Sequence, residues 1–274
     1  MREISGDENL NFKRMFLYLI SNFFRGVIGH LCSLNIAFIA VPEVEEGPDS
    51  PSRKHLNWFV RNYLPVILPP GRIDILEIGV GSGYLLNLLA TSGYSGRYVG
   101  VDVRRRKNLP IVESGPFDFE FVEQDFNSYS TDALFDLIIS ITVLEHMEQD
   151  RQAVVQAASM LKPGGVQVHI VPSFWSLFLF LTHGFRQYNP RRMLWIFKEI
   201  NNVRFFRLGG AFSFLLHFFI ITLPLFFFKS EKPRHTILYS KLTSICNRLD
   251  RLVPLCSSIY VALAVKDYEL LPGK

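Results

Sequence analysis

The sequence predicts an α/β fold in which helices cover both faces of a parallel sheet. Between residues 57 and 172, short apolar runs typical of strands alternate with segments long enough for helices. Alternation of this kind requires crossover connections between parallel strands. A glycine-rich turn follows the first run, as expected where a buried strand leads into a helix. The predicted strands are RIDILEIGV, RYVGVDV, FEFVEQD, FDLIISI and VQVHIV.

The rest of the chain is expected to extend this region at both ends. Residues 1–56 form a helical extension, apolar over residues 12–41, that ends in the linker-like PEVEEGPDSPSR and lacks the pattern of a signal peptide. Residues 173–256 form a helical insertion that is both apolar and basic. Residues 257–274 hold one more strand, SSIYVALAVKDY, which returns to the sheet, and a tail.

Charge is unevenly distributed along the 274 residues. Residues 1–183 carry 15 basic and 20 acidic side chains, whereas residues 184–251 carry 12 and 3. The basic segment also holds the most apolar run of the chain, LGGAFSFLLHFFIITLPLFFF, at residues 208–228. Basic residues beside an apolar run favour an anionic membrane surface over nucleic acid as a partner. The three cysteines form no CxxC pair, so we predict a reduced compartment and no metal site.

The stretch ILEIGVGSGY, residues 75–84, predicts a nucleotide-binding turn. Glycines at this position let the backbone turn sharply and let a ligand approach without a Cβ in the way. Asp102 follows at the end of the next predicted strand, where a carboxylate accepts hydrogen bonds from a ribose diol. Together these features indicate an adenosine-containing cofactor. A dinucleotide fingerprint requires G-x-G-x-x-G, and here the third glycine comes one residue early.

The form E-I-G-V-G-S-G resembles the first motif of class I S-adenosylmethionine-dependent methyltransferases. The resemblance continues through VGVDV, EQDF, FDLIISITVLEHM and LKPGG, and it covers roughly residues 57–172. VLEH with LKPGG is typical of the subgroup that methylates small molecules and lipids. The resemblance implies a Rossmann-like sheet and S-adenosyl-L-methionine as cofactor.

Carried over to this sequence, the family's motifs imply a set of cofactor contacts. Glu77 would orient the glycine turn and the amino end of the methionine moiety, and Asp102 would hold the ribose hydroxyls. Asp125 would accept from the adenine amino group, with Phe126 packed on the ring. Ser140 would lie beside the methionine moiety. The glycines that line the cofactor would be Gly79, Gly81 and Gly83.

Acceptor contacts and catalysis are expected from two later segments. His146, in the loop after the fourth predicted strand, is a candidate general base, which is needed only if the acceptor is a hydroxyl or a protonated amine. His169, inside the fifth predicted strand, is expected to be a core or sheet-face residue. THGFRQYNPRR supplies the candidate substrate contacts His183, Arg186, Tyr188 and Arg191, whose alternative role is a solvated basic face.

The apolar run at residues 208–228 is long enough to span a membrane. A single crossing would put the last strand on the wrong side of the membrane from its sheet. The remaining options are an interfacial helix or hairpin broken at Pro224, or a buried cap over an apolar acceptor. We favour peripheral association with the cytoplasmic membrane face.

The sequence therefore predicts a methyltransferase that acts on a lipid, a lipid-linked glycan or another membrane-proximal acceptor. Two alternatives remain at this point. One is an NAD(P)-dependent oxidoreductase, which the glycine spacing disfavours. The other is a non-catalytic, membrane-associated protein that retains a cofactor-binding fold.

Overall fold

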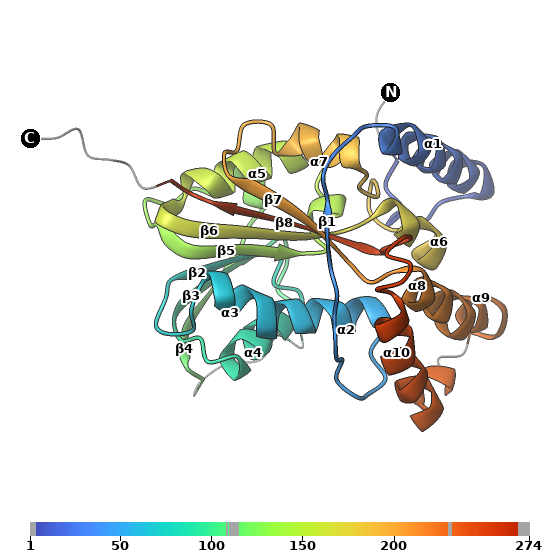
Figure 1. Cartoon of the computed structure of the whole chain (residues 1–274). Coiled ribbons are helices and arrows are strands. Elements are labelled where there is room, and N and C mark those ends of the chain that lie inside the picture. Colours follow the sequence, from blue (N-terminus) through green and yellow to red (C-terminus); the bar gives the residue numbers. More distant parts are fainter. Residues whose placement is uncertain (1–3, 108, 110–114, 230–231, 268–274) are drawn as a thin grey trace, which may run out of the picture.

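The structure is a computed structural model that describes residues 4–107, 109, 115–229 and 232–267. An eight-stranded sheet runs through the molecule in the order β1-β7-β8-β6-β5-β2-β3-β4 (Figure 1). The strands are β1 (Ala37–Ile39), β2 (Ile75–Ile78), β3 (Gly96–Asp102), β4 (Phe117–Glu123), β5 (Phe135–Ile141), β6 (Leu161–Pro172), β7 (Val203–Leu208) and β8 (Ile259–Val265).

The middle of the sheet is parallel, as the alternation of strands and helices predicts. Strands β2 to β6 pair in parallel with one another, in the order β6-β5-β2-β3-β4. Strand β8 runs antiparallel between β6 and β7. The predicted return of the last strand to the sheet is confirmed, because Val261 of β8 is paired with both Ile170 of β6 and Phe206 of β7.

Two predictions about the flanking segments are wrong in part. Residues 173–256 are not helical throughout, because β7 lies inside them and pairs with β8, with Phe206 and Leu208 buried. The apolar stretch 12–41 is helical only in α1 (Phe12–His30), and β1 then adds a parallel edge strand to β7.

Helices cover both faces of the sheet, as predicted (Figure 1). One face packs against α2 (Pro51–Trp58), the π-helical turn η1 (Phe59–Tyr63), α3 (Leu64–Ile67) and α4 (Tyr84–Thr91). The other face packs against α5 (Asp150–Ser159) and α7 (Pro190–Ile196). Each face therefore has its own apolar core, and the sheet separates the two.

A helical cap lies between β7 and β8. It comprises α8 (Ala211–His217), the π-helical turn η5 (Phe218–Thr222), α9 (Leu223–Phe228), the short turn η6 (Lys232–His235) and α10 (Ile237–Leu249). The expected break at Pro224 does not occur, because the helix continues through this residue. Proline lacks an N–H and crowds the carbonyl four residues earlier, and the wider π turn of η5 accommodates both effects.

Helix α1 packs against the body through small and polar residues: Tyr18, Asn22, Gly26 and Gly29. The hydroxyl of Tyr18 donates to the carbonyl of His183, and the side chain of Asn189 donates to the carbonyl of Arg25. A Cβ at Gly26 would lie 1.9 Å from the ring of Phe174. The close approach of α1 thus depends on this glycine.

We expect Gly26→Ala to destabilise the docking of α1 by about 1–3 kcal/mol, the usual cost of overpacking. Alanine favours an isolated helix over glycine, so local propensity alone predicts the opposite sign. Hydrogen exchange of the α1 amides would measure the effect. Gly71→Ala is the matched control, since a Cβ there meets nothing within 4 Å. Unchanged α1 exchange in Gly26→Ala would contradict the packing described here.

Candidate active site

The carboxyl ends of the parallel strands bring the predicted cofactor residues to one edge of the sheet. The glycine turn follows β2, Asp102 ends β3, Asp125 follows β4, and Thr142 follows β5. Ligands of open α/β sheets bind in the crevice outside the carboxyl ends of the strands. The arrangement therefore matches the predicted cofactor site.

Asp102 holds the glycine turn directly. Its Oδ2 accepts a hydrogen bond from the Gly81 backbone N–H at 2.8 Å. Gly81 has a φ of 55°, and a Cβ added there would meet nothing within 4 Å, so this part of the turn faces open space. A Cβ on Gly79 would instead lie 2.3 Å from Val143. A turn open at Gly81 and edged by a carboxylate fits an adenosine-containing cofactor.

Glu77 lies deeper than its predicted role requires. Its side chain is buried in the sheet, and Oε2 accepts a hydrogen bond from the Tyr98 hydroxyl at 2.6 Å. Burial, together with the nearby Asp102 charge, outweighs this hydrogen bond and raises the pKa of Glu77 from 4.5 to about 8. Among the described residues it is Asp102, rather than Glu77, that binds the glycine turn. The role of Glu77 at the amino end of the methionine moiety stays a prediction.

The pKa of Glu77 is about 8 in the folded protein and 4.5 in the unfolded chain. Between these two pH values the folded state therefore keeps a proton that the unfolded state has released. Folding stability contributed by Glu77 is therefore full below pH 4.5 and is lost as the pH rises to about 8. We expect the melting temperature of the cofactor-free protein to fall more from pH 5 to pH 8 than that of Glu77→Gln. Burial lowers the pKa of His169 to about 3 and that of His217 to about 4, so both stay neutral in the fold over this window and affect the two proteins equally. Parallel curves would show that Glu77 is ionised in the fold.

Two predicted cofactor contacts have side chains that lie in the interior, and their roles stay predictions. Phe126 is 3% exposed and belongs to the apolar core beneath α5, so its ring offers little surface to an adenine. The side chain of Ser140 is fully buried, and its Oγ is 2.8 Å from His169 Nδ1. His169 is a core residue, as predicted. Asp125 is exposed and caps the turn η2 (Phe126–Ser128) through the Asn127 N–H, so it remains a candidate for adenine.

Tyr84, directly after the glycine turn, links the turn to α2 and was not predicted from the sequence. The hydroxyl of Tyr84, at the start of α4, donates to Asn57 Oδ1 at 2.5 Å, and the guanidinium of Arg53 lies 4.6 Å from the centre of the Tyr84 ring. Both partners come from α2, which crosses the predicted boundary between residues 1–56 and 57–172. The sequence signal for this contact is the tyrosine that directly follows the third glycine.

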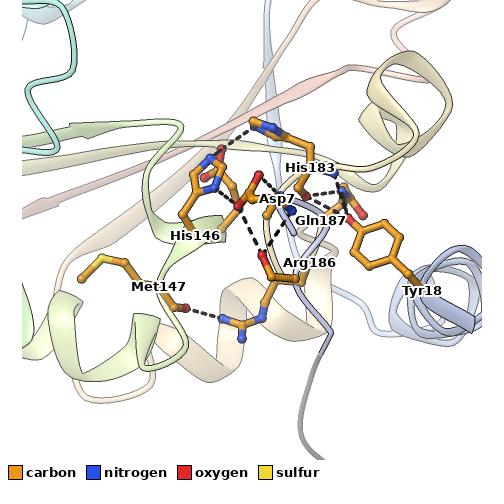
Figure 2. A network of polar contacts seen from close by, with 10 residues as sticks. Asp7, Tyr18, His146, Met147, His183, Arg186 and Gln187 are labelled. Carbon is orange, nitrogen blue, oxygen red and sulfur yellow. Dashed lines mark hydrogen bonds and ion pairs between the residues drawn. The ribbon is translucent and has the colours of Figure 1, made fainter. Parts of the chain in front are cut away.

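A polar network joins the loop after β5 to the N-terminal segment (Figure 2). Asp7 Oδ2 is 2.6 Å from His146 Nδ1, and Asp7 Oδ1 accepts from the Gly184 N–H. Burial alone would raise the pKa of Asp7, but hydrogen bonds from His146 and Gly184 hold it below the usual value. The rings of His146 and His183 lie edge to face, 4.6 Å apart. The structure thus brings His146 and His183 together and adds Asp7.

Arg186 and Tyr188 support this loop from inside, and their polar atoms bond to protein groups, so a role as acceptor contacts has no support in the described structure. Arg186 Nη1 donates to the Met147 carbonyl at 2.8 Å and forms an ion pair with Asp150, both buried. The Tyr188 hydroxyl donates to Asp150 at 2.9 Å, and its side chain is fully buried. Arg191 is exposed at the start of α7 and is separate from the network, so it fits the alternative of a solvated basic face.

Comparisons with known proteins identify the family of the chain. Residues 52–204 match the family described as "Methyltransferase domain". The ubiquinone biosynthesis O-methyltransferase of Dictyostelium discoideum is 26% identical over 37% of this chain and 36% of its own length. The enzyme of the same name from Pectobacterium atrosepticum is 35% identical over 33% of this chain and 39% of its own length. The chain thus matches well under half the length of these relatives.

A solved structure shows the same fold. The N-methyltransferase NodS from Bradyrhizobium japonicum, in complex with S-adenosyl-l-homocysteine, has a TM-score of 0.50 and 18% identity. That match covers 80% of this chain and 89% of NodS.

The family match spans more than half of the chain, which therefore belongs to the methyltransferase-domain family. It has the class I fold, is an enzyme, and uses S-adenosylmethionine as its methyl donor. This finding sets aside the alternative of an NAD(P)-dependent oxidoreductase.

Proposed function

We propose that the enzyme methylates a hydroxyl of an apolar acceptor, a lipid or lipid-linked molecule, while resting on an anionic membrane surface. The choice of oxygen is supported by the relatives named as O-methyltransferases. The choice of a membrane-borne acceptor rests on one structural observation, the inverted polarity of three helices. Each of them buries several polar or small residues and exposes large apolar residues on its outer face.

Helix α1 shows the inversion most clearly. Its buried residues are Tyr18, Asn22, Gly26 and Gly29. Large apolar side chains cover its outer face: Phe16, Leu17, Ile20, Phe23, Phe24, Val27 and Ile28. A helix on the surface of a protein surrounded only by water normally shows the opposite pattern. The apolar face of α1 is therefore suited to lipid.

The cap repeats the pattern in α8–α9 and α10. Its two parts meet in a small apolar core of Leu216, Ile221 and Tyr239, and polar residues are buried around it: Ser213, His217, Thr222, Thr243 and Asn247. The outer faces expose large apolar residues: Leu215, Phe219 and residues 225–228 in α8–α9, and Ile237, Leu238 and Ile245 in α10. An exposed apolar area spread over several helices marks a membrane or protein interaction site. Exposed Lys13, Lys229 and Lys241 lie on the same helices or at their ends and favour anionic headgroups.

Topology favours a surface position over a single crossing. Ala211–Phe228 is long and apolar enough to span a membrane. However, β7 before it and β8 after it pair in the same sheet, so both flanks lie on one side. Helices α8 to α10 connect the carboxyl end of β7 to the start of antiparallel β8, at the edge that carries the cofactor residues (Figure 1).

The inverted helices also lie next to the polar network. Helix α6 (Leu177–Phe180) contacts both α1 and η5. The ring of Phe180 lies 5.8 Å from that of His183 and 5.4 Å from that of His217. An acceptor whose apolar part stays in lipid would thus find its reactive end near His146 and His183.

His146 is the candidate base for a hydroxyl acceptor. When bound, S-adenosylmethionine supplies a methyl group on a sulfonium that carries its own leaving group, so the chain has to align the acceptor, exclude water and remove one proton. Asp7 contacts Nδ1 of His146 and leaves Nε2 as the atom that would accept this proton. A carboxylate placed in this way orients the ring and stabilises the imidazolium that forms.

The proposal is tested by incubating the full chain with methyl-labelled S-adenosylmethionine and either a total lipid extract or a water-soluble extract. We expect the label to enter the lipid fraction as an O-methyl group. His146→Ala should lower the turnover number while the affinity for S-adenosylhomocysteine stays unchanged. Label confined to the water-soluble fraction would contradict a membrane-borne acceptor.

A further inference from the structure

We propose that Asp7, His146 and His183 form a binding site for one first-row divalent cation, with Zn²⁺ as the reference ion. The three side chains come from the N-terminal segment, the loop after β5 and the loop after α6. Each offers one ligand atom, and these atoms all lie within 4.8 Å of one another. Figure 2 shows the three side chains turned toward a common point.

A second observation comes from Glu145, which lies beside the same cluster. Its side chain is fully buried, yet neither carboxylate oxygen receives a hydrogen bond from a residue that the structure describes. Oε1 instead lies 3.4 Å from His183 Nε2 and 3.9 Å from His146 Nε2. A buried carboxylate without hydrogen bonds is costly unless a positive charge compensates it.

The charges of the cluster call for such compensation. Two carboxylates, Asp7 and Glu145, face two imidazoles, which leaves two negative charges when both rings are neutral. Arg186, from the same loop as His183, forms an ion pair with Asp150 and donates to the Met147 carbonyl. A divalent cation would balance the pair. Protonation of His183, whose pKa the two carboxylates raise against the effect of burial, is the competing solution.

The ligand chemistry narrows the choice of ion. Imidazole nitrogens suit Zn²⁺, Fe²⁺, Ni²⁺ and Cu²⁺, whereas Mg²⁺ and Ca²⁺ prefer all-oxygen sites. Three protein ligands leave at least one coordination position open, as in catalytic zinc sites. If the proposed function holds, an acceptor hydroxyl would take this position, where a cation lowers its pKa. His146 would then serve as a ligand, and solvent would remove the proton in its place.

Cation binding is measured on the full chain after treatment with a chelator, by calorimetry with Zn²⁺ and by the visible absorption of Co²⁺. Neither cofactor nor acceptor is added. We expect one cation per chain, and at least a tenfold loss of affinity in His183→Ala and in Asp7→Asn. His235→Ala removes an exposed histidine outside the cluster and should leave binding unchanged.

Circular dichroism of each variant separates lost ligands from lost fold, and His183→Gln provides a second variant of similar volume. Zn²⁺ binding that is absent, or equally strong in His183→Gln and His235→Ala, would overturn the inference. The result is independent of the proposed function. Binding without label transfer to lipid would retain the cation site and remove the proposed acceptor. Undiminished transfer in the presence of chelator would retain the proposed acceptor and show that the cation takes no part in the transfer.

Discussion

Replacing Asp102 with alanine is expected to weaken the binding of S-adenosylhomocysteine by about 1–3 kcal/mol, or roughly 5- to 150-fold. The variant loses the carboxylate proposed to accept from the ribose hydroxyls. It also releases the Gly81 N–H, which Asp102 accepts at 2.8 Å, so the glycine turn is less well ordered before the cofactor binds. Calorimetry on the purified protein measures the change.

Asp118→Ala is the matched control for this experiment. Asp118 is an exposed carboxylate in β4, near the start of the strand and therefore at the opposite edge of the sheet from the cofactor residues. It should bind S-adenosylhomocysteine like the unchanged protein. Equal affinity in a folded Asp102→Ala variant would remove Asp102 from the cofactor site.

The second large effect is expected when Phe219, Phe226, Phe227 and Phe228 are replaced together by serine. These side chains are 56%, 62%, 67% and 78% exposed, so the fold should survive. Each phenylalanine fully buried in lipid contributes about 1.5–3 kcal/mol, and the four changes should therefore lower vesicle binding by roughly 10⁴-fold or more. Flotation with vesicles that contain anionic lipid measures the loss.

High salt should weaken the binding of the unchanged protein by a smaller factor, because it screens only the lysines. Val66 and Leu134 are exposed apolar residues elsewhere on the surface, and their change to serine is the control. Resistance to salt and to carbonate washing would indicate a spanning helix. Failure to bind vesicles, with unfolding of the serine variant, would indicate a buried cap.

The central sheet could be predicted because its pattern is local. Runs of apolar residues such as those of β5 and β8 are continuous in sequence, and the glycine turn with Asp102 needs only two neighbouring strands. Strand β7 was missed because its arginines resemble the basic border of the apolar run that follows. Strand β1 was missed because it has three residues and pairs with β7, far along the chain.

The candidate site was predictable only in part, for physical reasons. Ser140 and Phe126 stand at the expected positions of the chain, but the direction of their side chains is set by packing against His169 and α5. Asp7 is 139 residues from His146, and only the docking of α1 brings the two together. The outward direction of the apolar face of α1 could not be predicted either, because the spacing of apolar residues does not show which face of the helix packs on the protein.

The claim that three inverted helices rest together in the membrane is tested most directly by measuring depth. A fluorophore is attached to single cysteines introduced at Phe24, Phe227, Leu238 or Leu134, in a protein whose native cysteines are replaced by alanine. Brominated lipids in anionic vesicles then quench each probe according to its depth. We expect strong quenching at the first three positions and none at Leu134, whereas quenching confined to Phe227, or to no position, would contradict a common membrane position of the three helices.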